Sequence, residues 1–142
     1  MASLKAKLFA SASANAGLQA FLLNGSTFQW GDIQEPQQWD LTNHSAVTVF
    51  QVSGPPDYTA AGPMYTGWYR MQFTIYGHGN DSENATGVAQ ALKAWLLTIT
   101  TLTQNQTPNN YVVGNKDGGI AQTQPLTYLR LVDVMMFYDE SI

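Results

Sequence analysis

Residues 68–99 constrain the fold more than any other stretch of this sequence. In residues 68–76 the side chains alternate between apolar and polar, which is the pattern of a strand that buries one face. The apolar positions of this strand are Tyr69, Met71, Phe73 and Ile75. Each contributes about 1.5–3 kcal/mol when buried. We therefore expect one face of this strand to lie in the hydrophobic core.

A turn and an amphipathic helix follow this strand. Gly77, His78 and Gly79 interrupt the alternation, and Asn80 with Glu83 predicts a capping box at the start of a helix. Apolar residues then recur every three or four positions, as on one face of a helix. They are Ala85, Val88, Ala89, Leu92, Trp95, Leu96 and Ile99. We expect this apolar stripe to pack along the apolar face of the preceding strand.

Length and charge limit the classes of protein. At 142 residues, the chain is expected to form a single domain, residues 1–142. The formal net charge is -4, so counterion release cannot drive tight binding to nucleic acid. Only 11% of residues are charged, against about 25% in an average domain. Because interface cores are depleted in charge, this composition suits a surface that is covered by partners.

The sequence lacks cysteine, and it also lacks any segment typical of secretion or of membrane insertion. There is no cysteine, which excludes disulfides and thiolate metal sites. The N-terminal residues lack the continuous apolar run of a secretory signal, and no segment has the length needed to span a bilayer. We therefore expect no contact with membranes.

The N-terminal part predicts short elements. A first helix capped by Ser3 would bury Leu4, Leu8 and Ala12, and Asn15, Ala16 and Gly17 predict its left-handed stop. One further helical turn is expected over residues 18–22, followed by a brief strand at Phe28 and Trp30.

The longer strands lie in the rest of the chain. Residues 46–52 predict a strand, and residues 126–138 predict a closing strand well beyond the usual 5 or 6 residues. Between them, residues 111–114 predict a short strand, and Asp117 to Gly119 predict a turn. The resulting fold class is α+β: a mainly antiparallel sheet of about four strands, with an N-terminal helix and a central helix on one face.

Two segments indicate self-association. The loop of residues 53–67 joins strands that we expect to be antiparallel neighbours, and its length and apolar content suggest a function. Residues 132–138 are apolar on both faces apart from Asp133, whereas two helices can cover only one face of a sheet. Copies of the chain would then cover each other. The candidate contact residues are Pro55, Pro56, Tyr58, Met64, Tyr65, Met135 and Phe137.

Catalytic patterns in the sequence are weak. His78 between two glycines could act as a base, but a lone histidine in a turn is usually solvated or structural, and His44 has no visible partner. Gly77 and Gly79 precede a helix, as in phosphate-binding loops, but the third glycine is missing and acidic residues follow. The carboxylate pairs Asp32/Glu35, Asp81/Glu83 and Asp139/Glu140 have no fixed geometry. We expect no enzyme activity, no cofactor and no metal.

The order of elements resembles the small tail-completion or tail-terminator proteins of long-tailed bacteriophages, which join head to tail. The resemblance covers the opening helix, the first long strand, the strand-turn-helix and the closing strand. These are LKAKLFASASANAGLQAFL, AVTVFQVSG, WYRMQFTIYGHGNDSENATGVAQALKAWL and LTYLRLVDVMMFYDE. Residues 29–43 and 105–124 match poorly.

The resemblance implies a structural virion protein that is assembled in the host cytoplasm. It would form a homo-oligomeric ring, usually a hexamer, at the head-proximal end of the tail tube. The ring would stop tail growth, contact the tail-tube protein and the head-completion or connector protein, and let DNA pass through its lumen without specific binding. Two alternatives stay open: another virion component, such as a tail-tube subunit or head-completion protein, and a small ligand-binding or hydrolase domain that uses His78.

Overall fold

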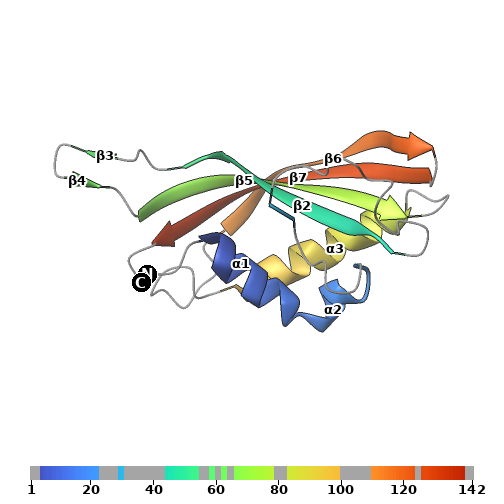
Figure 1. Ribbon diagram of the computed structural model, residues 1–142, viewed down its shortest axis with the longest axis horizontal. Helices are drawn as coiled ribbons and strands as arrows, with labels where there is room; N and C mark the ends of the chain where they lie inside the picture. The colour runs from blue at the N-terminus through green and yellow to red at the C-terminus, as the bar shows by residue number, and fades with distance from the viewer. Residues whose placement is uncertain are drawn as a thin grey trace.

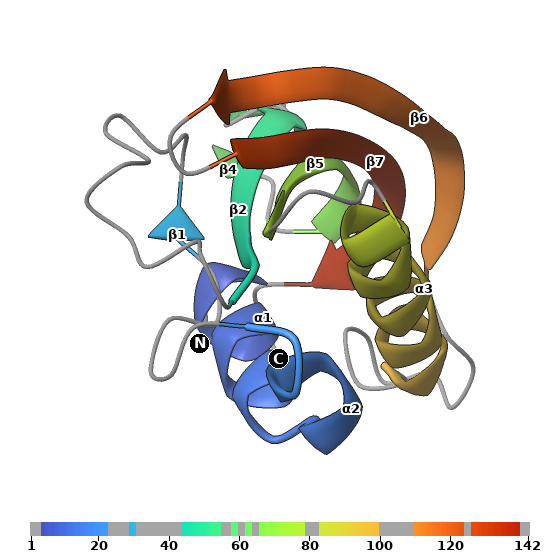
Figure 2. The same cartoon turned by 90° about the vertical axis from the view of Figure 1, so that its right-hand side faces the viewer.

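The protein is an α+β domain in which helices cover one face of a twisted sheet (Figures 1 and 2). The computed structural model describes residues 4–22, 29–30, 44–54, 58–59, 62–63, 66–78, 83–99, 110–123 and 126–139. In chain order the elements are α1 (Leu4–Ser13), α2 (Ala16–Gln19), β1 (Gln29–Trp30), β2 (Ala46–Ser53), β3 (Tyr58–Thr59), β4 (Gly62–Pro63), β5 (Thr66–His78), α3 (Glu83–Thr98), β6 (Asn110–Thr123) and β7 (Leu126–Asp139).

The main sheet has the strand order β1-β2-β5-β7-β6. Its four long strands are antiparallel, as predicted, and the two-residue strand β1 adds a parallel pair to β2. The register between β5 and β7 runs without a break from Thr66–Asp139 to His78–Thr127. The predicted fold class is therefore confirmed.

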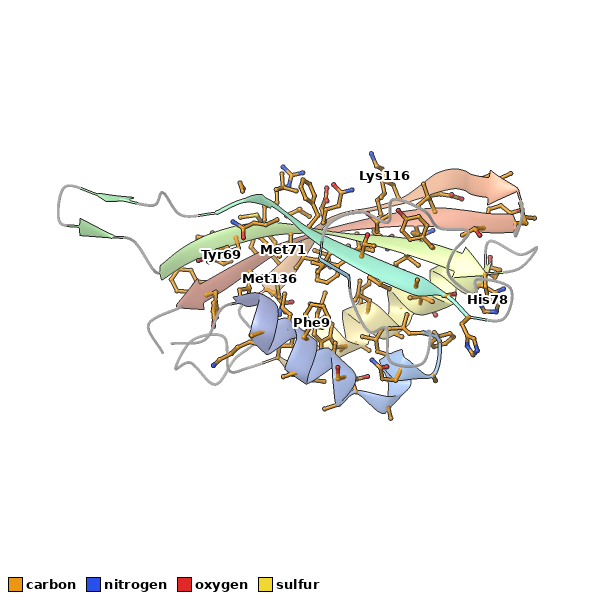
Figure 3. All side chains as sticks on the ribbon, in the orientation of Figure 1. Phe9, Tyr69, Met71, His78, Lys116 and Met136 are labelled. Atoms are coloured by element: carbon orange, nitrogen blue, oxygen red, sulfur yellow. The ribbon has the colours of Figure 1, made fainter. Side chains whose placement is uncertain are left out.

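The core lies between this sheet and the helices, where the sequence periodicity places it. All four predicted core residues of β5 are buried, as are the six predicted stripe residues within α3 and Ile99, which directly follows the helix. Phe73 packs edge-on against Trp95, with ring centroids 6.3 Å apart. The Trp95 indole Nε1 donates a hydrogen bond of 2.9 Å to Ser11 Oγ, which ties α3 to α1. In Figure 3, Met71 and Met136 lie on the helix side of the sheet, and Lys116 points away from the helices.

The two N-terminal helices are joined differently from the prediction. Leu4, Leu8 and Ala12 are buried as expected, but Gly17 does not adopt a left-handed conformation. Asn15 instead caps the start of α2, and its side chain accepts a 2.9 Å hydrogen bond from the Leu18 N–H. The second helical segment therefore begins at Ala16, two residues earlier than predicted. Asparagine favours both a helix stop and a helix start, which is why the sequence was ambiguous here.

The predicted turn at Asp117 to Gly119 is wrong, because β6 continues through it from Asn110 to Thr123. The register between β6 and β7 shifts between Asp117 and Gly119, so these residues form a bulge. Gly119 has a φ of 82°, and its N–H donates a 2.8 Å hydrogen bond to Asp117 Oδ1. Residues that can form a turn thus form a glycine bulge within a longer strand.

The connection between β2 and β5 carries a small ribbon of its own. The two long strands are antiparallel neighbours, as predicted. Between them, β3 pairs with β4 through Tyr58–Pro63 and Thr59–Gly62. Figure 1 shows this ribbon projecting beyond the end of the main sheet, away from α3.

Candidate functional site

The candidate functional site is on the sheet face opposite the helices. Residues that alternate with the core positions of β5 and β7 face this side, and their register pairs Trp68 with Phe137 and Arg70 with Met135. Trp68 and Arg70 are exposed, and Met135 and Phe137 are half-buried. The helices do not cover this face, and the part of it at the start of β5 and the end of β7 is in contact with solvent.

Three aromatic rings meet on this face. The Trp68 ring lies 5.3 Å from that of Phe137 and 5.6 Å from that of Tyr111, with interplanar angles of 68° and 67°. These edge-to-face arrangements are favourable between aromatic rings. Trp68 is nevertheless 46% exposed and Tyr111 is 52% exposed. We call Phe50, Trp68, Tyr111, Met135 and Phe137 the open-face patch.

The exposed apolar residues gather at one end of the sheet. Nine large apolar side chains are exposed in the described residues, and six of them lie at this end. They are Phe50, Val52, Trp68, Tyr111, Val112 and Val113. At the other end of the same face, Thr48, Thr74 and Tyr76 are buried. An apolar patch confined to one region of a surface is typical of an interaction site.

One ion pair borders the open-face patch. Arg70 Nη2 lies 3.2 Å from Asp133 Oδ2, with side-chain exposures of 46% and 25%. The other carboxylate oxygen, Asp133 Oδ1, is buried and has no hydrogen-bond partner among the residues that the structure describes. Because the two charges neutralise each other, the patch suits an uncharged, apolar contact.

His78, the candidate catalytic base, makes a structural contact at the opposite end of β5. Its Nδ1 lies 2.9 Å from Ser45 Oγ, and its backbone N–H donates to the same Oγ at 3.2 Å. Ser45 has a relative exposure of 0%, so its hydroxyl is closed to a substrate. Burial, and to a smaller extent the neighbouring charge of His44, lowers the pKa of His78 below its ordinary value of 6.5. The sequence did not reveal Ser45, because it is 33 residues from His78 and the pairing of β2 with β5 brings them together.

Gly77 allows a close approach between β5 and α3. A Cβ at this position would lie 2.6 Å from the Ala85 Cβ and 2.7 Å from the Ala85 backbone nitrogen. This packing accounts for a glycine at position 77. Gly79, the second glycine of the phosphate-loop pattern, lies outside the described residues. The predicted helix caps Ser3 and Asn80 and the predicted strand residue Phe28 also lie outside them.

The structure describes only part of the predicted contact residues. Met135 and Phe137 both belong to the open-face patch. Tyr58 lies in β3, where only the backbone is described, and Pro55, Pro56, Met64 and Tyr65 lie outside the described residues. Phe50, Trp68 and Tyr111 were not among the predicted contact residues, because their place in the patch depends on strand register, which the sequence does not give.

The predicted carboxylate pairs cannot be assembled from the described residues, since Asp32, Glu35, Asp81 and Glu140 lie outside them. In the part of the chain that the structure describes, no three acidic, histidine or cysteine side chains are placed to hold a metal ion. Within that same part, no helix has the length and hydropathy to cross a membrane. Searches of protein-family models and of curated protein sequences find no match to this chain.

Proposed function

We propose that this chain is a non-enzymatic structural protein that closes into a ring at the head-proximal end of a bacteriophage tail tube. The ring ends tail growth and joins the tail to the head connector, with DNA passing through its lumen. The observation that carries the proposal is the open-face patch, in which Trp68 and Tyr111 remain about half exposed in the single chain. Covering these rings with a neighbouring subunit removes apolar area from water, at about 25 cal/mol per Å².

Ring closure needs a heterologous interface, in which two different surfaces of each subunit meet. The open-face patch is one such surface. The ribbon of β3 and β4 is a second, because it projects beyond the main sheet from the end of the sheet that carries the patch (Figure 1). A subunit with two distinct surfaces of this kind can bind one neighbouring subunit on each side. If the rotation between neighbouring subunits divides evenly into a full turn, the chain of subunits closes into a ring.

Charge supports the same proposal. Each subunit has a formal net charge of -4, so six copies carry -24. An acidic ring repels the DNA backbone, which lets DNA move through the lumen without adhering to it. The low fraction of charged residues also fits a surface that is largely covered after assembly.

The test is the mass of the assembly, measured by light scattering and native mass spectrometry in solution and on isolated tail tubes. We expect a closed species of about six times 15.6 kDa. Electron microscopy distinguishes a single closed ring from the open stacks that a tail-tube subunit would form. A strict monomer that never joins a tube contradicts the proposal.

The matched variants are Trp68→Ser, in the open-face patch, and Leu97→Ser, which removes a 70% exposed side chain on α3. Trp68→Ser should keep the circular dichroism spectrum of the folded chain but shift the mass to that of the monomer. Leu97→Ser should assemble like the unmodified chain. Assembly of both variants at the unmodified mass would exclude the open-face patch as the interface.

A further inference from the structure

Ser45 and His78 connect four elements at one corner of the fold. Ser45 directly precedes β2, and its N–H donates a 2.9 Å hydrogen bond to the Phe21 carbonyl, just after α2. His78 ends β5, and its carbonyl accepts a 2.6 Å hydrogen bond from Asn84 Nδ2 in the first turn of α3. The Ser45–His78 contact therefore holds α2, β2, β5 and α3 together, at the end of β5 where Figure 3 labels His78.

A neutral His78 with an unprotonated Nδ1 gives the polar groups at this corner a complete set of hydrogen-bond partners. The buried Ser45 Oγ already accepts a hydrogen bond from the His78 backbone N–H. Its own hydroxyl proton is then free to be donated to Nδ1, 2.9 Å away, if Nδ1 carries no proton. Protonation turns Nδ1 into a donor, so that Ser45 Oγ receives two hydrogen bonds and its own proton loses its acceptor. A buried donor without an acceptor is costly.

The titratable side chains of the described elements at this corner are few. His44 lies next to Ser45 and opposes a positive charge on His78. Glu83 in the first turn of α3 is exposed, so solvent screens its attraction for a charged His78. Tyr128 on β7 pairs with Gly77 in the register, next to the pair of His78 and Thr127. The helix α2 carries no titratable side chain.

We infer that Ser45, His78 and Asn84 form a pH-sensitive clamp, which holds α2 and the start of β2 against the end of β5 while His78 is neutral and releases them on acidification. The direction of this pH dependence follows from the difference in proton binding between the folded and the unfolded chain. Because the folded state holds the His78 proton less tightly than the unfolded chain does, the clamp is at full strength above about pH 6.5 and weakens as the pH falls below it. The inference is independent of ring assembly.

Hydrogen exchange measured by mass spectrometry tests the clamp. After correction for the intrinsic pH dependence of exchange, amides of residues 44–48 and 75–78 should lose about threefold or more of their protection between pH 7.5 and 5.0, since one proton changes an opening equilibrium by at most tenfold per pH unit. Amides of β7 at residues 132–136 should keep theirs. Equal protection of the corner at both pH values would overturn the inference.

Two variants separate the clamp from general acid sensitivity. His78→Asn places an acceptor oxygen near the Nδ1 position that cannot be protonated there, so corner protection should become independent of pH. His44→Gln should keep the transition but move its midpoint to higher pH, because a like charge is removed. In the unmodified protein, the NMR titration of the His78 ring should share its midpoint with the Ser45 amide signal. Different midpoints, or an unchanged transition in His78→Asn, would refute the clamp.

Discussion

Substituting Gly77 by Ala should disrupt the contact between β5 and α3. The new Cβ would lie 2.6 Å from the Ala85 Cβ, 2.7 Å from its backbone nitrogen and 2.8 Å from its Cα. Ordinary contacts between such atoms are near 3.5–4.0 Å, so the first turn of α3 must move by roughly 1 Å. Two of the three clashing atoms belong to the backbone, and no rotamer change relieves them. We expect a loss of about 3 kcal/mol in the free energy of unfolding, at the upper end of the usual cost of overpacking.

Urea unfolding followed by far-ultraviolet circular dichroism measures this loss. With a slope of about 2 kcal/mol per molar urea, the midpoint should fall by about 1.5 M. The matched control is Gly114→Ala in β6, where the added Cβ would lie 3.7 Å from the Asp133 Cβ and Oδ2. Gly114 has no positive φ, so alanine should be neutral or stabilise by about 0.5 kcal/mol. A midpoint for Gly77→Ala within 0.2 M of the unmodified protein would refute the reasoning.

Two further predictions concern single side-chain contacts. Ser11→Ala removes the acceptor of the buried Trp95 indole N–H and should lower the free energy of unfolding by about 1–3 kcal/mol in a urea titration. The control Gln90→Ala, at an exposed position of α3, should change this free energy by less than about 0.5 kcal/mol. A double-mutant cycle on Arg70 and Asp133 should give a coupling energy below about 1 kcal/mol that decreases in 0.5 M salt, because the pair is partly exposed. A coupling of several kcal/mol, unaffected by salt, would show that the pair is effectively buried.

Periodicity predicted the elements that bury one regular face. β5 and α3 were found because their apolar residues repeat every second position and every three or four positions, and the structure buries them as expected. β7 was predicted instead from a long run, apolar on both faces apart from Asp133 in its second half, and the structure buries Val132, Val134, Met136 and Tyr138 on one of those faces. Elements with a regular inner face are predictable, because the hydrophobic effect acts on that face alone.

Irregular backbone was predicted poorly. β6 was interpreted as a short strand and a turn, because its register against β7 shifts at three places and its alternation is lost. The candidate site depends on a different kind of information. Met135 and Phe137 are close in the sequence, but Trp68 and Tyr111 are 43 positions apart and meet only through the registers of β5, β7 and β6. A single sequence carries no direct record of such pairings.

The position of β7 has a consequence for biosynthesis. This strand lies between β5 and β6 in the sheet but follows both of them in the chain. During translation, β5 and β6 have no common neighbour until residues 126–139 leave the ribosome. The nascent chain must therefore hold one hydrogen-bonding edge of β5 unpaired, and the sheet closes only when β7 inserts between β5 and β6. Pairings between such distant segments also make closure slow compared with the folding of helical domains.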